Sequence, residues 1–160
     1  MITSRFITCL FVLLLLTADF NLSAQTTVVK QGDGWVLRVD GQPFDVKGVT
    51  FGYDEDVENY DVYFQELKFL GVNSIRTWGT NENTPRLLDA AERHGIKVML
   101  GIWMRHGRPG MEADDSFDYL NDTEGKEEMY TNAIEIVQQY KDHPALLTWG
   151  VGNEVYLNTA

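Results

Sequence analysis

Residues 145–154 read ALLTWGVGNE, an apolar run that passes through a glycine into an amide and a carboxylate. The run over 145–151 is apolar at almost every position, which is typical of a strand that is buried on both faces. Asn153 and Glu154 stand just beyond its carboxyl end. The stretch therefore predicts a buried strand that carries a polar pair to one edge of its sheet.

The same alternation of strand and helix precedes this stretch three times. The sequence predicts strands over 46–51, 72–79 and 96–103, and helices with an apolar stripe over 56–71, 84–95 and 123–143. Strands that alternate with amphipathic helices form a parallel sheet covered by helices. The fold class predicted is therefore α/β, as either a doubly wound sheet or a (β/α)8 barrel.

Residues that start and stop helices stand at the expected ends of these segments. Gly71 and Gly95 occupy positions where a helix ends with a glycine cap. Thr84 is predicted to be the N-cap of the second helix, with Pro85 at its first position. Pro144 is predicted to end the third helix.

A hairpin is predicted before the first core strand. Asp40 and Gly41 lie between two extended runs, and Asp-Gly is a strong signal for a two-residue hairpin turn. We therefore divide the chain beyond its first 24 residues into a lead and β-hairpin over 25–45 and a β/α domain over 46–160.

The loop after the first strand decides between the two α/β folds. A doubly wound nucleotide-binding sheet would usually carry a glycine-rich phosphate loop there. Residues 49–59 instead read VTFGYDEDVEN, whose acidic side chains would oppose a pyrophosphate. Polar and aromatic residues do gather after the predicted strands, as a barrel active site requires: Tyr53, Asp54, Arg76, Trp78, Trp103, Arg105, His106, Asn153 and Glu154.

Residues 1–24 are typical of a secretory signal peptide. Arg5 precedes an apolar run over 6–16, and small residues precede Gln25. The alternative is a membrane anchor, but the apolar run is shorter than the roughly 20 residues that a spanning helix needs. Cleavage after Ala24 would remove Cys9, the one cysteine, so we expect a secreted or periplasmic protein without disulfides.

The charge of the chain restricts its partners. The formal net charge is -11, and an acidic protein repels phosphate backbones and anionic membrane surfaces. We therefore expect a neutral substrate, with no nucleic acid partner and no membrane contact after signal cleavage. No cofactor and no metal are predicted, because the acidic stretch over 112–122 lacks the ligand spacing of a calcium loop. The oligomeric state is not predicted.

Glu154 is the strongest catalytic candidate. At the mouth of a barrel strand, with Trp149 and Trp103 as apolar walls, partial desolvation would raise the pKa of its carboxyl and suit it to general acid catalysis. Asn153 can donate to a substrate hydroxyl, and the planar cation of Arg76 can orient a second carboxylate. From these residues alone, a turn residue followed by an ordinary helix acid is an equal alternative.

Three segments resemble a known group of enzymes. HPALLTWGVGNE at 143–154, LGVNSIRTW at 70–78 and DVKGVTF at 45–51 are similar to segments of the retaining glycoside hydrolases of clan A, above all family 2. The resemblance covers about 35–156. It implies that Glu154 is the general acid/base, that Asn153 contacts the sugar 2-hydroxyl, and that Arg76 supports the nucleophile.

One segment departs from family 2. That family commonly ends its third strand with an acidic pair, whereas this chain has GIWMRHGRPG over 101–110. The segment resembles endo-acting clan members such as family 5, and the β-glucanosyltransferases of family 72. We therefore expect a secreted hydrolase of β-glycosidic bonds that acts with retention, with transglycosylation as an alternative. A non-catalytic carbohydrate-binding half-barrel is a further alternative.

The remaining site residues are predicted to bind substrate, each with a structural alternative. Trp78 and Trp103 could stack on sugar rings or pack in the protein, and Tyr53 belongs to the same predicted set. His106 could bind sugar hydroxyls or lie in a solvated loop. We expect His143, before Pro144, to have a structural role.

The sequence predicts only half of a barrel. A complete barrel takes about 250 residues. The resemblance places the nucleophile, a second glutamate, on a seventh strand, and Glu55, Glu58 and Glu66 lie too early in the chain to be that residue. We therefore expect the N-terminal half of a (β/α)8 barrel, a fragment that is inactive alone.

Overall fold

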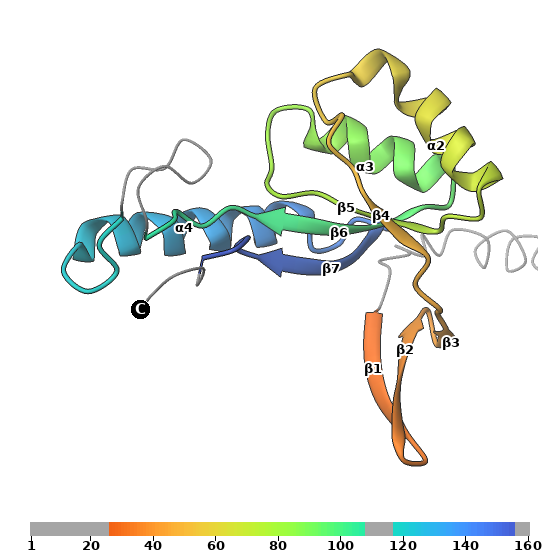
Figure 1. Ribbon diagram of the computed structural model, residues 1–160, viewed down its shortest axis with the longest axis horizontal. Helices are drawn as coiled ribbons and strands as arrows, with labels where there is room; N and C mark the ends of the chain where they lie inside the picture. The colour runs from red at the N-terminus through yellow and green to blue at the C-terminus, as the bar shows by residue number, and fades with distance from the viewer. Residues whose placement is uncertain (1–25, 108–116, 156–160) are drawn as a thin grey trace, which may run out of the picture.

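The computed structural model describes residues 26–107 and 117–155. Its centre is a four-stranded parallel sheet with the order β4-β5-β6-β7 (Figure 1). The strands are β4 (Gly48–Thr50), β5 (Ser74–Arg76), β6 (Lys97–Ile102) and β7 (Leu146–Val151). The predicted signal peptide lies outside the described residues.

Each of the first three strands is followed by a helix. The helical elements are η1 (Val57–Asn59), α2 (Tyr60–Phe69), α3 (Thr84–Arg93) and α4 (Thr123–Tyr140). The order of the strands in the sheet is their order in the chain, which is how a barrel wall is wound; a doubly wound sheet reverses its order at a switch point. The prediction of a barrel-type α/β fold is confirmed, over four of its strands.

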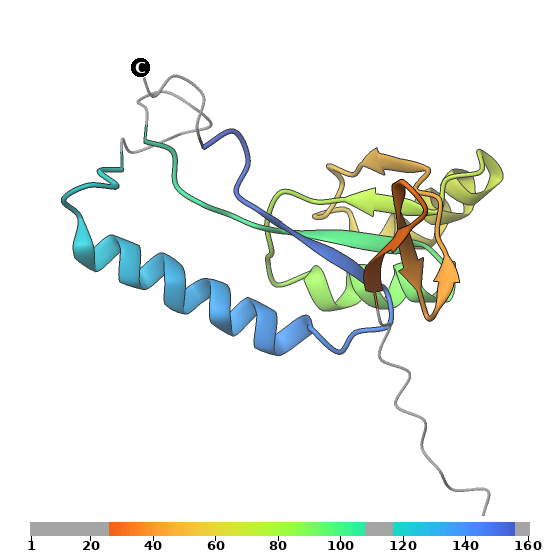
Figure 2. The same cartoon turned by 90° about the horizontal axis from the view of Figure 1, so that it is seen from below.

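One face of the sheet holds the hydrophobic core. Ile75 of β5 and Val98 of β6 are paired in register and buried against α2 and α3. Phe64 of α2 and Leu88 of α3 are completely buried there. Burial of side chains of this size contributes about 1.5–3 kcal/mol each. The apolar stripes of α2 and α3 therefore pack against the sheet. Figure 1 shows these two helices on one side of it, and Figure 2 shows α4 running beside β6 and β7.

The opposite face of the sheet is open among the described residues. Thr50, Arg76, Met99 and Thr148 form one row across it, since their strands pair at these positions. They line a groove of about 470 Å³ that Leu37 of β2 and Val46, just before β4, also border. In a closed barrel this face would be the interior, and Arg76, the last residue of β5, stands at its carboxyl-terminal end, where barrel enzymes hold their site.

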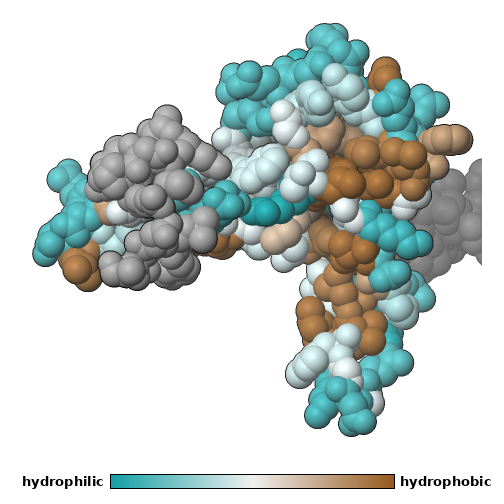
Figure 3. Space-filling view, viewed as in Figure 1, coloured by the Kyte–Doolittle hydropathy of each residue, from teal (hydrophilic) through white to brown (hydrophobic). Residues whose placement is uncertain are grey.

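The N-terminal hairpin has three strands instead of the predicted two. They are β1 (Thr26–Gln31), β2 (Gly34–Val39) and β3 (Gln42–Pro43), all antiparallel. Asp40 and Gly41 have φ of 52° and 76°, so the predicted turn is confirmed. Val28 of β1 and Trp35 of β2 are exposed. Figure 3 shows a hydrophobic surface that runs along the hairpin toward the sheet.

The helix ends agree with the sequence except at one cap. Gly71 and Gly95 have φ of 82° and 61°, as predicted for glycine caps. The N-cap of α3 is Asn83, and the prediction of Thr84 was wrong. The hydroxyl of Thr84 accepts the N–H of Asn81 at 2.9 Å, so Thr84 closes the loop before the helix and is the first helical residue.

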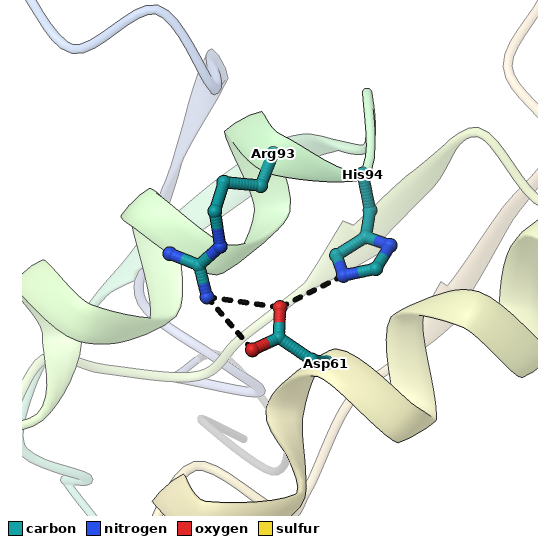
Figure 4. A network of polar contacts seen from close by, with 3 residues as sticks. All are labelled: Asp61, Arg93 and His94. Atoms are coloured by element: carbon teal, nitrogen blue, oxygen red, sulfur yellow. Dashed lines mark hydrogen bonds and ion pairs between the residues drawn. The ribbon is translucent and has the colours of Figure 1, made fainter.

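A polar cluster joins the exposed sides of α2 and α3 (Figure 4). Arg93 donates to both oxygens of Asp61 at 2.9 and 3.0 Å, and His94 Nε2 lies 2.8 Å from Oδ1. Hydrogen bonds from His94 and then Arg93 hold the pKa of the Asp61 carboxyl below its usual range. The cluster therefore pairs the acidic first turn of α2 with the basic last turn of α3.

Within residues 26–107 and 117–155, no helix has the length and apolar character needed to cross a membrane.

Candidate active site

Arg76 and Asn153 meet at the carboxyl ends of the strands. Arg76 Nη2 donates to Asn153 Oδ1 at 2.8 Å, which joins residues that are 77 positions apart in the chain. A guanidinium can only donate, so the Asn153 oxygen must face Arg76 and the amide N–H₂ must point elsewhere. The described residues offer that amide no acceptor. It is therefore available to donate to a ligand hydroxyl, as predicted for Asn153.

Arg76 has a buried donor without a partner among the described residues. Its Nε is buried and makes no hydrogen bond within the described ranges. The guanidinium lies 6.0 Å from the centre of the Trp78 ring, a distance typical of a weak cation–π contact. A buried donor without a partner is unfavourable by about 1–3 kcal/mol, so this cation fits an additional acceptor such as a carboxylate.

A close crossing of two backbones positions Arg76 and Trp78. Thr77 N–H donates to the Met99 carbonyl at 3.1 Å, and Gly101 N–H donates back to the Thr77 hydroxyl at 3.1 Å. A Cβ on Gly101 would lie 2.2 Å from the Trp78 carbonyl carbon, so only glycine fits there. The bonds of Thr77, which lies between Arg76 and Trp78, therefore hold the end of β5 tightly against β6.

The chain leaves β7 through a turn with two left-handed residues. Gly152, with φ of 73°, donates its N–H to the Ile102 carbonyl at 2.9 Å, which ends the ladder between β6 and β7. Glu154 has φ of 54° although it carries a side chain, a conformation that is unfavourable by about 1–2 kcal/mol for such residues. The neighbouring contacts must therefore hold this turn in place.

Glu154 lies at the predicted place but in a different environment. Its side chain is exposed, so the described residues do not supply the partial desolvation that we predicted for the mouth of a barrel, and that prediction stays untested. Trp149 does not wall it, because Trp149 packs against the core on the helix side of the sheet. Side chains alternate along a strand, so a residue that faces the helices cannot also line the open face.

His106 is the most deeply buried polar side chain at this edge. It is 3% exposed, and its Nε2 lies 2.7 Å from the backbone oxygen of Asn153. The Trp103 ring meets it edge-on at 5.1 Å. His106 is thus not in a solvated loop, and Trp103 has a packing contact. Binding of sugar by either residue stays a prediction.

Tyr53 is not brought to this cluster. It is 61% exposed beyond β4, where its ring lies 5.1 Å from that of Tyr63. Its groove is lined by residues of β4 and α2, and no contact joins it to Arg76 or Asn153 in the described part of the chain. Its predicted role in substrate binding remains untested.

The sequence analysis missed Asn81, which joins two of the strand-end loops. Asn81 Nδ2 donates to Asp54 Oδ2 at 2.9 Å, and Tyr60 donates its hydroxyl to the Asp54 carbonyl oxygen. Burial, and then the nearby Asp54, raise the pKa of the Tyr60 hydroxyl. The only signal for Asn81 was its place in a polar loop, TNEN, which is too common to single it out.

Metal binding has weak support. Among the described residues, Asp89, Glu92 and His143 offer ligand atoms within 4.8 Å of one another. The Ala145 N–H donates to His143 Nδ1 at 3.1 Å, so in the neutral ring Nε2 carries the proton and has no lone pair for a metal. Nε2 instead lies 3.3 Å from Asp89, which agrees with a structural role for His143.

The sequence of the barrel domain matches a known family. Residues 45–160 match the family described as "Glycosyl hydrolases family 2, TIM barrel domain". The chain belongs to this family. The resemblance predicted from the three sequence segments is therefore confirmed at the level of the family.

Individual proteins are similar to this chain. The chain is 27% identical to mannan endo-1,4-beta-mannosidase F of Aspergillus clavatus over 179 aligned positions, which cover 77% of this chain and 39% of that protein. Its fold is similar to the endo-1,4-beta-mannanase of Rhizomucor miehei, with a TM-score of 0.61 and 18% identity over 79% of this chain and 48% of that one.

A beta-glycosidase from Bacteroides vulgatus is also similar, with a TM-score of 0.59 and 20% identity over 84% of this chain and 17% of that one. The chain thus spans less than half of the length of each of these relatives.

Proposed function

We propose that these residues are the N-terminal half of a glycosidase barrel that hydrolyses β-glycosidic bonds with retention, with Glu154 as the acid/base. The observation that carries the proposal is the hydrogen bond between Arg76 and Asn153. This bond brings Arg76 and the predicted sugar-binding residue Asn153 together beside Glu154. All three lie at the carboxyl ends of the strands, where barrel enzymes hold their catalytic residues.

The chemistry assigns one task to each residue. Glu154 gives its proton to the glycosidic oxygen while a second carboxylate attacks the anomeric carbon and the old C–O bond breaks. Water then attacks the glycosyl-enzyme, and Glu154 takes the proton from that water. Asn153 donates to a sugar hydroxyl through its unpaired amide, and the buried Nε of Arg76 supports the second carboxylate.

The second carboxylate would come from outside the four strands described. In a retaining enzyme the two carboxyls are about 5 Å apart, and we place the nucleophile on a later strand of the barrel. The exposure of Glu154 fits this view, since later strands and their loops would cover it. We therefore expect the 160 residues alone to give no turnover. From the predicted signal peptide over residues 1–24, we also expect the complete protein to be secreted.

Mannan is the first substrate to test. Two of the relatives are named as endo-1,4-mannanases, and the acidic chain favours a neutral glycan. Transfer to a sugar hydroxyl is the alternative outcome of the same intermediate, because water and sugar compete for it. Product analysis at high oligosaccharide concentration separates the two: longer products mean transfer.

The test is turnover of β-1,4-mannan by the complete protein expressed from its natural gene. Proton NMR of the first product should show the β-anomer, as retention requires. Glu154→Gln should lower kcat by several orders of magnitude, whereas Glu127→Gln, on the exposed side of α4, should not. Full activity of Glu154→Gln, or a product that is first α, would refute the proposal.

A non-catalytic carbohydrate-binding protein is the competing proposal. It would use Trp78, Trp103 and Asn153 and would not need Glu154. The reading frame after Ala160 distinguishes the two: further β/α units and a strand that ends in glutamate support the enzyme, and a stop codon supports the binding protein.

A further inference from the structure

Asn153 is held by two residues, one at the end of β5 and one beyond the end of β6. Arg76, at the end of β5, donates to its side chain at 2.8 Å. His106, four residues after β6, lies 2.7 Å from its backbone oxygen. A carbonyl oxygen can only accept, so His106 Nε2 must carry the proton of this hydrogen bond. The two contacts fix both the amide and the backbone of Asn153.

The backbone contact acts directly on Glu154. The carbonyl of Asn153 and the N–H of Glu154 belong to one planar peptide unit, so a bond that fixes the oxygen also fixes the plane. Glu154 leaves that plane with φ of 54°, in the left-handed region that side-chain-bearing residues avoid. Release of the carbonyl would let the peptide rotate toward an ordinary conformation and would swing the Glu154 carboxyl away.

His106 is itself fixed firmly enough to serve as this anchor. Its side chain is 3% exposed, and the Trp103 ring meets it edge-on at 5.1 Å. Its own backbone oxygen accepts the N–H of Phe117 at 2.9 Å. The ring is therefore locked by packing, and its backbone by a hydrogen bond across the base of the loop.

We propose that His106 is a positioning residue, which holds the Asn153–Glu154 peptide so that Glu154 faces the glycosidic oxygen. This rests on the proposed role of Glu154 as acid/base. It differs from the sugar-binding role that the sequence suggested for His106, because the Nε2 proton is used within the protein. A positioning residue should affect proton transfer and leave the affinity for sugar unchanged.

Leaving-group chemistry separates these roles. A dinitrophenolate leaves without protonation, whereas an alkoxide from a natural glycan needs the proton of the acid. In the complete protein, His106→Leu removes the donor and His106→Gln keeps an N–H at similar reach. We expect His106→Leu to lower kcat/KM, which reports formation of the glycosyl-enzyme, about 100-fold on a mannan oligosaccharide, with little change of kcat/KM on the dinitrophenyl β-glycoside. His106→Gln should restore most of the loss.

Two results would overturn the proposal. One is an equal loss of kcat/KM on both substrates with a raised KM, which would mean that His106 binds sugar. The other is a crystal structure of the His106→Leu protein in which Glu154 keeps its positive φ and its position; this needs no turnover. If that variant does not fold, His106→Asn, whose amide is too short to reach the carbonyl, takes its place in both measurements.

A control separates failure here from failure of the proposed function. Glu154→Gln should show the same dependence on the leaving group as His106→Leu, and more strongly. If Glu154→Gln loses kcat/KM equally on both substrates, Glu154 is not the acid and the proposed function fails. If Glu154→Gln is selective and His106→Leu is not, only the role of His106 fails.

Discussion

Gly101→Ala should be among the most damaging single-methyl additions in this chain. A Cβ at this position would lie 2.2 Å from the Trp78 carbonyl carbon and 2.4 Å from its oxygen, 1.2 Å and 1.0 Å short of the 3.4 Å where ordinary contact begins. The obstacle is the backbone of Trp78 and Gly79, so it cannot yield by a side-chain rotation. Overpacking of this kind destabilises a protein by about 1–3 kcal/mol, and we expect the upper end of that range.

Gly79→Ala is the matched control, at the residue that follows Trp78. A Cβ there would lie 3.6 Å from Trp103 Cβ, an ordinary contact. Both substitutions stiffen the unfolded chain by a similar amount, about 0.4–1 kcal/mol, so this contribution cancels in the difference between the two variants. The difference therefore reports the steric overlap alone, which we expect to be about 2–3 kcal/mol.

The assay is urea unfolding of both variants in the complete protein, followed by circular dichroism and by tryptophan fluorescence. Gly101→Ala should also change the fluorescence of the folded state and lower activity, because it displaces Trp78 and the adjoining Arg76. Equal stability of the two variants would refute the close crossing, and with it our explanation of how β5 presents Arg76.

Two further predictions concern charged groups. Asp61→Asn should lower stability at neutral pH, and its difference from the wild type should shrink below about pH 4. The pKa of Asp61 is lowered in the folded state, so the carboxylate stabilises the fold at pH values above its ordinary pKa. This stabilisation is lost as the pH falls and the carboxylate is protonated. Thermal unfolding between pH 3 and pH 7 checks this, and a constant difference would contradict the role of the cluster with His94. Arg76→Lys should lower kcat/KM about 100-fold, since an ammonium cannot both bond Asn153 and supply a second donor in the same plane. Kinetics against Arg86→Lys on the surface of α3 check this, and equal activity of the two variants would contradict it.

Local signals predicted most of the fold. Each of the four core strands, the three helices and the Asp40–Gly41 turn has its cause in neighbouring residues, such as apolar spacing or a glycine where φ is positive. The strand β1 was missed because its sequence, TTVVKQ, is mostly polar and was taken for a lead segment. Gly32 and Asp33, between two alternating runs, were the turn signal that could have revealed it.

Long-range contacts could not be predicted in the same way. That Arg76 and Asn153 end on adjacent parts of one sheet edge follows from parallel strands, but that they bond depends on side-chain geometry 77 positions apart. The partner of His106 is a backbone oxygen, which every residue has, so no residue type points to it. The orientation of Trp149 was misjudged because its side chain faces the helices and not the open face.

The most direct test of the role of Glu154 is azide rescue. In the Glu154→Ala variant of the complete protein, an activated aryl β-glycoside should still form the glycosyl-enzyme, but water should attack it slowly for want of a base. Azide needs no base, so it should restore turnover and yield a β-glycosyl azide, detectable by proton NMR. No effect of azide, or an α-glycosyl azide as product, would contradict the assignment of Glu154 as the acid/base of a retaining enzyme.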